Sequence, residues 1–275
     1  MDGKALRLKR FLTRPNGRMV IFPLDHGVSC GPIPGLEQME DVMRMGIGGG
    51  ADGLVLHKGM LRFLESVSGR LPGVFMHLSA STQLGPSFHH KVLVGTVEEA
   101  IRRGADGVSM HVNLGDQGEP EMLKDLGTVG SMCADWHIPL LVMTYARGAH
   151  VPQPVPDAAI AHAARVAAEL GADIIKIPTP KDDSTLAKIT ADLRLPVVVA
   201  GGSKDPDVRL FLDRVGRSLA AGARGVAVGR NVFQSERPLA LLRVICGMVH
   251  QDISASEAWD LLRHAPDDEE PARCD

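Results

Sequence analysis

The stretch GADIIKIP at Gly171–Pro178 joins the end of a helix-like segment to a short apolar run. Glycine commonly follows the last turn of a helix, where the chain adopts the left-handed conformation, and a β-branched run after it is typical of a strand. The run IIKI is almost wholly apolar, as expected of a parallel strand that is buried on both faces. The stretch therefore predicts the helix-to-strand junction of an α/β fold.

The same junction recurs along the chain. Gly-Ala-Asp also stands at Gly50–Asp52 and Gly104–Asp106, and a variant with arginine stands at Gly222–Arg224. An apolar run follows each copy, and four more apolar runs lie between the copies or before them. The eight predicted strands are Met19–Leu24, Gly53–Leu56, Val74–Leu78, Gly107–Met110, Pro139–Met143, Ile174–Ile177, Pro196–Ala200 and Gly225–Val228. Eight short strands that mostly alternate with helical segments predict a (β/α)8 barrel.

We therefore expect an α/β protein with one TIM barrel over residues 1–264, including an N-terminal capping helix. A chain of 275 residues suits this fold, because such barrels run to about 250 residues as one unit. The alternative is an open Rossmann-like sheet, but the glycine fingerprint of that fold does not follow the first predicted strand. Residues 265–275, APDDEEPARCD, are predicted to be an acidic, disordered tail.

Composition narrows the class of protein. The chain is 44% hydrophobic and 23% charged, which suits a soluble globular protein, and its net charge of −3 gives no attraction to nucleic acid or anionic membranes. No apolar run reaches the roughly 18 residues of a membrane span. The cysteines show no zinc-like spacing, so we expect unpaired thiols in a reducing, cytoplasmic compartment. They are Cys30, Cys133, Cys246 and Cys274.

Two glycine-containing loops follow the last two predicted strands, where many barrels bind a phosphate group. Gly201, Gly202 and Ser203 follow one strand, and Gly229 and Arg230 follow the other. Glycine lets backbone N–H groups approach an anion, and arginine adds a fixed positive charge. These loops predict a phosphate site. The alternative is that the glycines only make tight turns.

Lys176 is the one charged residue of its predicted strand. A lysine inside a barrel loses solvation, which lowers the pKa of its amine from about 10.4 and makes it a nucleophile toward a ketone. The alternative is an outward-pointing lysine in an ion pair. Lys58, after the second strand, competes for the same role.

Tyr145 and Asp25 lie at the ends of the fifth and first predicted strands. Tyr145 is the only tyrosine, and one strand spacing would separate it from Lys176, so it could transfer protons near a Schiff base. Asp25 could stabilise the iminium or transfer a proton of the carbinolamine. The alternatives are a buried ring for Tyr145 and a helix cap or turn for Asp25.

Histidines at the ends of the first four strands leave two interpretations open. They could hold a divalent metal together with Asp25, or they could line a polar pocket as neutral hydrogen-bonding groups. No short HxH pair is present, so we favour the second interpretation and expect neither a metal nor a cofactor. The residues are His26, His57, His77 and His111.

Eight segments at the strand ends together resemble one family, the archaeal-type class I aldolases of the DeoC and FbaB kind. They are PLDHGVSCGP, VLHKG, HLSAST, VSMHVNLG, PLLVMTYARG, GADIIKIP, VVVAGGSK and GVAVGRNVFQ, in this order over roughly residues 6–250. The chain looks most similar to the branch of 2-amino-3,7-dideoxy-D-threo-hept-6-ulosonate synthases and the related 2-amino-4,5-dihydroxy-6-oxo-7-(phosphooxy)heptanoate synthases. Two segments, Thr144–Ala146 and Thr179–Ser184, differ from the forms familiar in that family.

The resemblance implies a Schiff-base lysine at Lys176, a proton-transferring tyrosine at Tyr145 and an assisting aspartate at Asp25. It also implies that the glycine loops and Arg230 bind phosphate. We add that Arg147, His111 or Lys58 could hold a carboxylate of the aldehyde partner, with His26 in the same polar pocket. A large homo-oligomer, such as a decamer, is expected from the resemblance alone.

The expected activity is that of a class I aldolase or transaldolase, a lyase or transferase. An enamine derived from dihydroxyacetone phosphate or 6-deoxy-5-ketofructose 1-phosphate would join an aldehyde such as aspartate semialdehyde, in aromatic amino acid or aminohydroxybenzoate biosynthesis. The alternatives are a class I fructose-bisphosphate aldolase, a metal-dependent barrel enzyme that uses the histidines, and a barrel that binds a sugar phosphate without catalysis.

Overall fold

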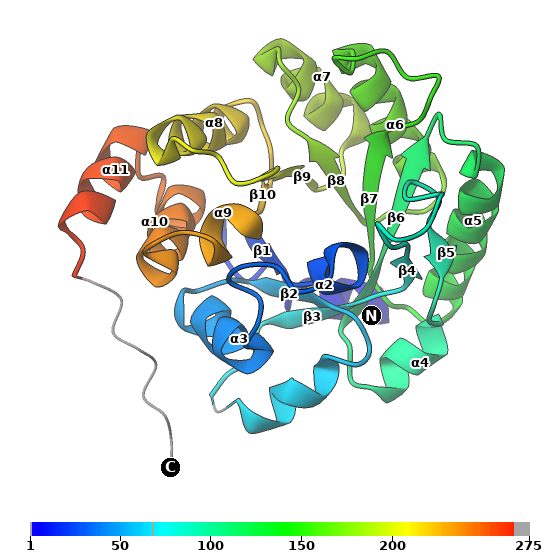
Figure 1. Ribbon diagram of the computed structural model, residues 1–275, viewed down its shortest axis with the longest axis horizontal. Coiled ribbons are helices and arrows are strands. Elements are labelled where there is room, and N and C mark those ends of the chain that lie inside the picture. Colours follow the sequence, from blue (N-terminus) through cyan, green and yellow to red (C-terminus); the bar gives the residue numbers. More distant parts are fainter. Residues whose placement is uncertain (1, 68, 267–275) are drawn as a thin grey trace.

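The computed structural model describes residues 2–67 and 69–266. Eight parallel strands close into a barrel in the order β1-β10-β9-β8-β7-β6-β3-β2 (Figure 1). Their bounds are β1 Met19–Pro23, β2 Gly53–Leu56, β3 Gly73–His77, β6 Gly107–Leu114, β7 Leu140–Ala146, β8 Ile174–Pro178, β9 Val197–Ala200 and β10 Gly225–Ala227. The closed parallel barrel confirms the predicted fold and excludes the open sheet. Each predicted strand is present, within a few residues at its ends.

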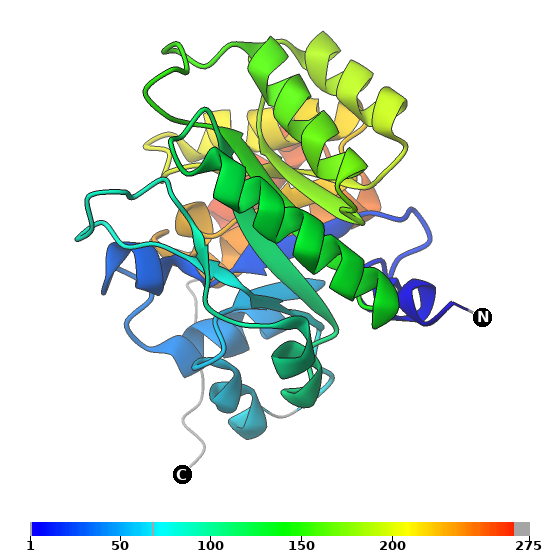
Figure 2. The same ribbon diagram turned by 90° about the vertical axis from the view of Figure 1, so that its right-hand side faces the viewer.

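Helices surround the barrel, as the two views in Figures 1 and 2 show. They are α1 Gly3–Leu8, α2 His26–Cys30, α3 Met39–Gly48, η1 Leu61–Ser66, α4 Val97–Arg102, α5 Glu119–Asp135, α6 Asp157–Glu169, α7 Asp183–Leu193, α8 Val208–Ala220, α9 Arg230–Phe233, α10 Pro238–Gln251 and α11 Ala255–His264. A small antiparallel hairpin, β4 Ser79–Ala80 with β5 Val92–Leu93, stands outside the barrel. The predicted tail begins within the described chain, but its residues 267–275 lie outside it.

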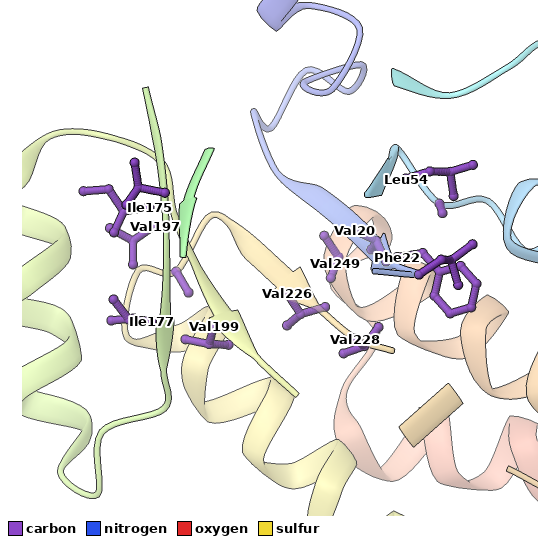
Figure 3. Close-up of a cluster of buried hydrophobic side chains, with 14 of the residues drawn as sticks. Val20, Phe22, Leu54, Ile175, Ile177, Val197, Val199, Val226, Val228 and Val249 are labelled. Carbon is purple, nitrogen blue, oxygen red and sulfur yellow. The ribbon is translucent and has the colours of Figure 1, made fainter. Parts of the chain in front are cut away.

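In most strands of the barrel, residues alternate between two separate apolar clusters. On β8, Ile174 belongs to the cluster inside the barrel, whereas Ile175 and Ile177 belong to the cluster between barrel and helices. Figure 3 shows the outer cluster, in which Val20 of β1 and Val226 of β10 lie close to Val249 of α10. The alternation therefore decides which side chains enter the barrel.

Two stacked phenylalanine rings fill the base of the barrel. Phe11, which follows the N-terminal helix α1, stacks on Phe75 of β3 with ring centroids 3.8 Å apart, and both rings are fully buried. A side chain at Gly73 would meet the Phe11 ring at 2.4 Å, and one at Gly107 would meet the Phe75 ring at 2.6 Å. The missing side chains of these two glycines therefore make room for the rings. The N-terminal segment caps the barrel, as predicted.

The aspartates of the Gly-Ala-Asp repeat join neighbouring strands at the base. Each accepts a hydrogen bond from a backbone N–H of the strand that precedes it in the barrel. The pairs are Val20 N with Asp52 at 2.7 Å, Val74 N with Asp106 at 3.0 Å, and Leu140 N with Asp173 at 2.8 Å. The repeat thus has a structural role at the end of the barrel opposite the predicted site.

The same three aspartates also hold the N-terminal segment across the base. Thr13 donates to Asp52 at 2.8 Å, Arg10 pairs with Asp106 at 2.7 Å, and Lys4 pairs with Asp173 at 3.0 Å. Partly exposed ion pairs contribute little each. The apolar plug of Phe11 therefore carries most of the stabilisation that this segment provides.

Replacing Phe11 by alanine should destabilise the protein without changing the residues at the mouth. Removal of a buried phenylalanine ring costs about 3–5 kcal/mol, because apolar contacts are lost and a cavity remains. Urea unfolding of Phe11→Ala measures this loss, with Leu6→Ala as the control, since Leu6 lies on α1 and is 48% exposed. Equal stability of the two variants would contradict the role of Phe11 as the plug.

In the described chain, no helix is both long and apolar enough to cross a membrane. The three cysteines that the structure describes, Cys30, Cys133 and Cys246, are free thiols, as expected from their spacing.

Candidate active site

A cavity of about 1130 Å³ opens at the carboxyl ends of β7, β8, β9 and β10. Most of the predicted site residues line it together. They are His26, Tyr145, Arg147, Lys176, Gly201, Gly202, Ser203, Gly229 and Arg230. Asp25, Lys58 and His111 are not among the lining residues. The mouth of the barrel therefore brings the predicted nucleophile and both glycine loops into one cavity.

Lys176 points into the barrel. It lies between Ile175 and Ile177, which face the helices, and its register partner on β7 is Met143 of the inner cluster. The side chain is buried, and Nζ donates a weak hydrogen bond to Met143 Sδ at 3.8 Å. Among the described residues, no carboxylate lies within ion-pair distance of Nζ. Lys176 is therefore not buried as one partner of an ion pair with these residues, which is the usual structural reason for a buried lysine.

Tyr145 lies two residues beyond Met143 on β7, and therefore on the same face of the strand, one layer nearer the mouth. The centroid of its ring lies 4.9 Å from the centroid of the His111 ring and 4.1 Å from Arg147 Cζ. The side chain is half-buried and lines the cavity together with Lys176. The Tyr145 hydroxyl can thus meet a ligand that reacts at Lys176.

Asp25 is surrounded by histidines. Its carboxylate lies 3.8 Å from His77 Nε2 and 3.7 Å from His26 Nδ1. Burial alone would raise the pKa of Asp25, but the positive charges that His77, His26 and Lys176 carry when they are protonated outweigh burial and hold the pKa well below its usual range. Asp25 is therefore an anion at neutral pH, within electrostatic reach of Lys176.

His77 and His111 have hydrogen-bond partners of their own. His77 Nδ1 lies 2.8 Å from Ser109 Oγ, and His111 Nε2 lies 2.9 Å from Asn113 Oδ1. Burial lowers the pKa of His77 to about 3 and that of His111 well below its usual value, so both rings are neutral at pH 7. Of the two interpretations of the histidines, these contacts favour the polar, hydrogen-bonding pocket. In residues 2–67 and 69–266, no three His, Cys, Asp or Glu side chains are grouped so that they could hold a metal ion.

The buried, neutral His77 should make stability depend on pH. The unfolded chain binds a proton at His77 below about pH 6.5, whereas the folded chain does so only near pH 3. Between these values the unfolded state holds more protons, so the free energy of unfolding should fall as the pH falls, by on the order of a few kcal/mol. Urea unfolding at pH 7 and pH 4 should show a smaller drop for His77→Gln than for the exposed control His150→Gln. Parallel drops would contradict this cause.

Asn231 holds the two glycine loops together. Its amide nitrogen donates to the carbonyls of Gly201 at 2.8 Å and Ser203 at 3.1 Å, and its oxygen accepts from the Asp205 N–H at 2.8 Å. Gly202 has a φ of +80°, which suits glycine in this turn. Because Asn231 is buried and fully used, the loop after β9 is fixed against the loop after β10. The sequence contained Asn231 in the VGRN segment, but its spacing did not indicate this function.

Arg230 supplies the charge of the second loop. Its Nε is buried and lacks a hydrogen-bond partner among the described residues. An arginine with an unused buried donor, in the same cavity as the exposed residues Gly202 and Ser203, suits a bound anion. The predicted phosphate residues thus line the same cavity as Lys176.

Lys58 lies away from the cavity. Its Nζ pairs with Glu99 at 3.2 Å, and its side chain is 45% exposed. A different lysine is buried near the histidines. Lys91, 6% exposed, follows the loop of the β4–β5 hairpin, and sequence analysis did not select it. No strand-end pattern precedes Lys91, because the hairpin stands outside the barrel.

Comparison with known proteins places the chain in one family. The sequence model described as DeoC/LacD family aldolase matches residues 19–235. A 2-amino-4,5-dihydroxy-6-oxo-7-(phosphonooxy)heptanoate synthase from Streptomyces griseus is 40% identical over 247 residues, which cover 90% of each chain. A 2-amino-3,7-dideoxy-D-threo-hept-6-ulosonate synthase from Archaeoglobus fulgidus is 39% identical over 260 residues, 94% of this chain and 96% of the relative.

Among solved structures, an archaeal fructose-1,6-bisphosphate aldolase resembles this fold with a TM-score of 0.81 and 30% sequence identity. The match covers 89% of this chain and 99% of that one. In that structure the catalytic lysine is covalently bound in the carbinolamine intermediate of the substrate. These comparisons confirm the resemblance to class I aldolases and the prediction of an enzyme. The chain belongs to the DeoC/LacD family of aldolases.

Proposed function

We propose that the protein is a Schiff-base aldolase or transaldolase whose nucleophile is Lys176. The observation that carries this proposal is the position of Lys176, which is buried, points into the barrel and lines the cavity beside both glycine loops. The amine needs a short path to a ketone and a neighbouring group that moves protons. Tyr145 lines the same cavity, and the charge of Lys176 contributes to the low pKa of Asp25.

The reaction would begin with addition of the neutral Lys176 amine to the ketone carbon of a phosphorylated donor. The carbinolamine loses water to form an iminium, and removal of a proton from the adjacent carbon, or retro-aldol cleavage, gives the enamine. The enamine carbon attacks an aldehyde, and hydrolysis releases the product and the free amine. Tyr145 would transfer protons during these steps, and the anionic Asp25 would stabilise the iminium.

The donor would be held by its phosphate at Gly201, Gly202, Ser203, Gly229 and Arg230. Dihydroxyacetone phosphate and 6-deoxy-5-ketofructose 1-phosphate both carry a phosphate near the ketone, and the acceptor we propose is aspartate semialdehyde. The names of the two relatives support this choice, because each describes a product with a carboxylate. A homo-oligomer such as a decamer is proposed on the family resemblance alone.

A class I fructose-bisphosphate aldolase is the second candidate. It is favoured by the 30% identity to the archaeal fructose-1,6-bisphosphate aldolase. Both candidates use the same lysine, so the acceptor distinguishes them. Cleavage of fructose 1,6-bisphosphate faster than condensation with aspartate semialdehyde would favour the second candidate.

Borohydride trapping tests the proposal directly. The enzyme is incubated with dihydroxyacetone phosphate and borohydride, with and without EDTA, and its peptides are mapped by mass spectrometry. A reduced adduct on Lys176 in both samples is the expected result. If a deoxy-ketose phosphate forms the adduct instead, the donor is different. If no ketone forms an adduct and activity requires metal, the Schiff-base mechanism is wrong.

A further inference from the structure

Lys91 is a buried cation for which the described part of the chain supplies no ion-pair partner. It is 6% exposed, and no carboxylate in the described chain lies within ion-pair distance of its Nζ. Nζ donates one hydrogen bond, to Ser81 Oγ at 2.5 Å, and lies 4.8 Å from the centroid of the Phe88 ring. An ammonium group carries three N–H donors, so two remain for another partner. Burying an unpaired charge costs free energy, and a bound anion would offset that cost.

Arg147 is a second cation, and its side chain is half-buried. Its guanidinium lies over the Tyr145 ring and makes no ion pair with any carboxylate among the described residues. His89, two residues before Lys91 in the hairpin loop, lines the cavity together with Arg147, so this loop and the segment after β7 meet at the cavity. Burial lowers the pKa of Lys91, and the charge of Arg147 lowers it further. Asp25 and the Cys30 thiol are the groups that act in the opposite direction, and Asp25 already serves His77, His26 and Lys176.

The two cations lie on the opposite side of Lys176 from the glycine loops. In the barrel, β9 and β10 follow β8 on one side, whereas β7, β6 and β3 follow it on the other. Arg147 comes directly after β7, and Lys91 belongs to the hairpin that begins after β3. The charge of Lys91 also lowers the pKa of His57, His77, His89 and His111. A donor held by its phosphate at β9 and β10 would therefore leave this side free for the acceptor.

We infer that Lys91 and Arg147 form a second anion site, which binds the carboxylate of a short aldehyde acceptor. The inference rests on the proposed function, since it assigns the acceptor side of that site. It replaces the exposed Lys58 by Lys91 as the lysine that selects the acceptor. His89, which lines the cavity with Arg147, lies beside this site. The hydrogen bond to Ser81 and the contact with the Phe88 ring fix the orientation of the ammonium group. Two of its N–H donors then remain for the carboxylate.

The test compares acceptors of equal carbon number with and without a carboxylate. Full-length enzyme is assayed with dihydroxyacetone phosphate and either aspartate semialdehyde or butanal, and with glyceraldehyde 3-phosphate as a phosphorylated aldehyde. Lys91→Met removes the charge, Lys91→Gln keeps a donor for Ser81, and Lys91→Arg restores the charge. Lys124→Met, on the exposed face of α5, is the matched control.

We expect Lys91→Met and Lys91→Gln to lower kcat/KM for aspartate semialdehyde by roughly 10- to 100-fold, as for loss of a charge-assisted hydrogen bond. The kcat/KM for butanal should change by less than about twofold, and so should the extent of borohydride trapping of the donor. Lys91→Arg should recover most of the preference for aspartate semialdehyde. The inference is overturned, with the Schiff base intact, if donor trapping is normal but both acceptors are affected equally, or if Lys58→Met removes the preference. Selective loss of glyceraldehyde 3-phosphate would assign the site to a phosphate. Absence of donor trapping in the wild-type enzyme would overturn the proposed function and this inference together.

Discussion

Lys176→Met should abolish carbon–carbon bond formation, with a loss on the order of 10⁴-fold or more in kcat, because the covalent route through the iminium is lost. Methionine has a similar length and fits beside Met143, the neighbour of Lys176 Nζ in the barrel. The fold should therefore remain, since Lys176 makes no ion pair with any residue that the structure describes, and its loss leaves no buried charge behind. Steady-state assay and borohydride trapping measure the two consequences, loss of turnover and loss of the adduct.

The control for this variant is Lys124→Met, which removes one exposed lysine from α5 and should keep both turnover and trapping. Circular dichroism and urea unfolding establish that Lys176→Met is folded. Normal turnover in the folded Lys176→Met enzyme would show that the enamine mechanism is wrong. An adduct that moves to Lys58 or Lys91 would assign the nucleophile to that lysine instead.

Tyr145→Phe should lower kcat by about 10²- to 10³-fold, within the range for loss of a general acid–base group. The substitution removes only the hydroxyl. The ring contacts with His111 and Arg147 can remain, so the walls of the cavity should keep their arrangement. Because Lys176 is unchanged, the variant should still form the reduced adduct, but more slowly, and exchange of the donor C–H with solvent deuterium should slow with turnover.

The deuterium exchange separates proton transfer from binding. A Tyr145→Phe enzyme that exchanges at the wild-type rate but condenses slowly would place Tyr145 at the acceptor step. Full activity in this variant would remove Tyr145 from the mechanism and leave Asp25 as the proton-transferring group. Thr144→Val is a matched control on the same strand, because Thr144 bonds the Ala163 carbonyl outside the cavity.

The fold was predictable because its strands are nearly continuous apolar runs that follow a recurring helix end. In β8, Ile174–Ile177 could be recognised as a buried parallel strand from residue type alone. The face of Lys176 could not be predicted in the same way. Inward and outward lysines have the same sequence pattern, and only closure of the barrel distinguishes them. The inner cluster around Met143 decides the question in favour of the inward position.

The acceptor side of the site could not be predicted, because it depends on a segment outside the repeating pattern. Lys58 has the strand-end position expected of a site residue, yet Glu99 of α4 pairs with it at the surface. Lys91 has no such position and is buried in the loop of the β4–β5 hairpin, where its backbone N–H contacts Met122 of α5. Its partner Ser81 lies ten residues earlier in that loop. Such contacts follow from tertiary packing, which spacing along the chain does not encode.

The hydrogen-bonded aspartates at the base give the barrel a quarter-turn symmetry that its mouth lacks. Asp52, Asp106 and Asp173 directly precede every second strand of the barrel. The fourth position of the series is Arg224, which instead donates to the Asn16 carbonyl of the N-terminal segment. The base of the barrel thus has four equivalent positions, of which three hold an aspartate. The N-terminal segment contacts the fourth position, Arg224. If a segment of two strands and two helices were replaced by one from another barrel, the new segment would need its own aspartate at the base. Its loops at the mouth could carry a different chemistry.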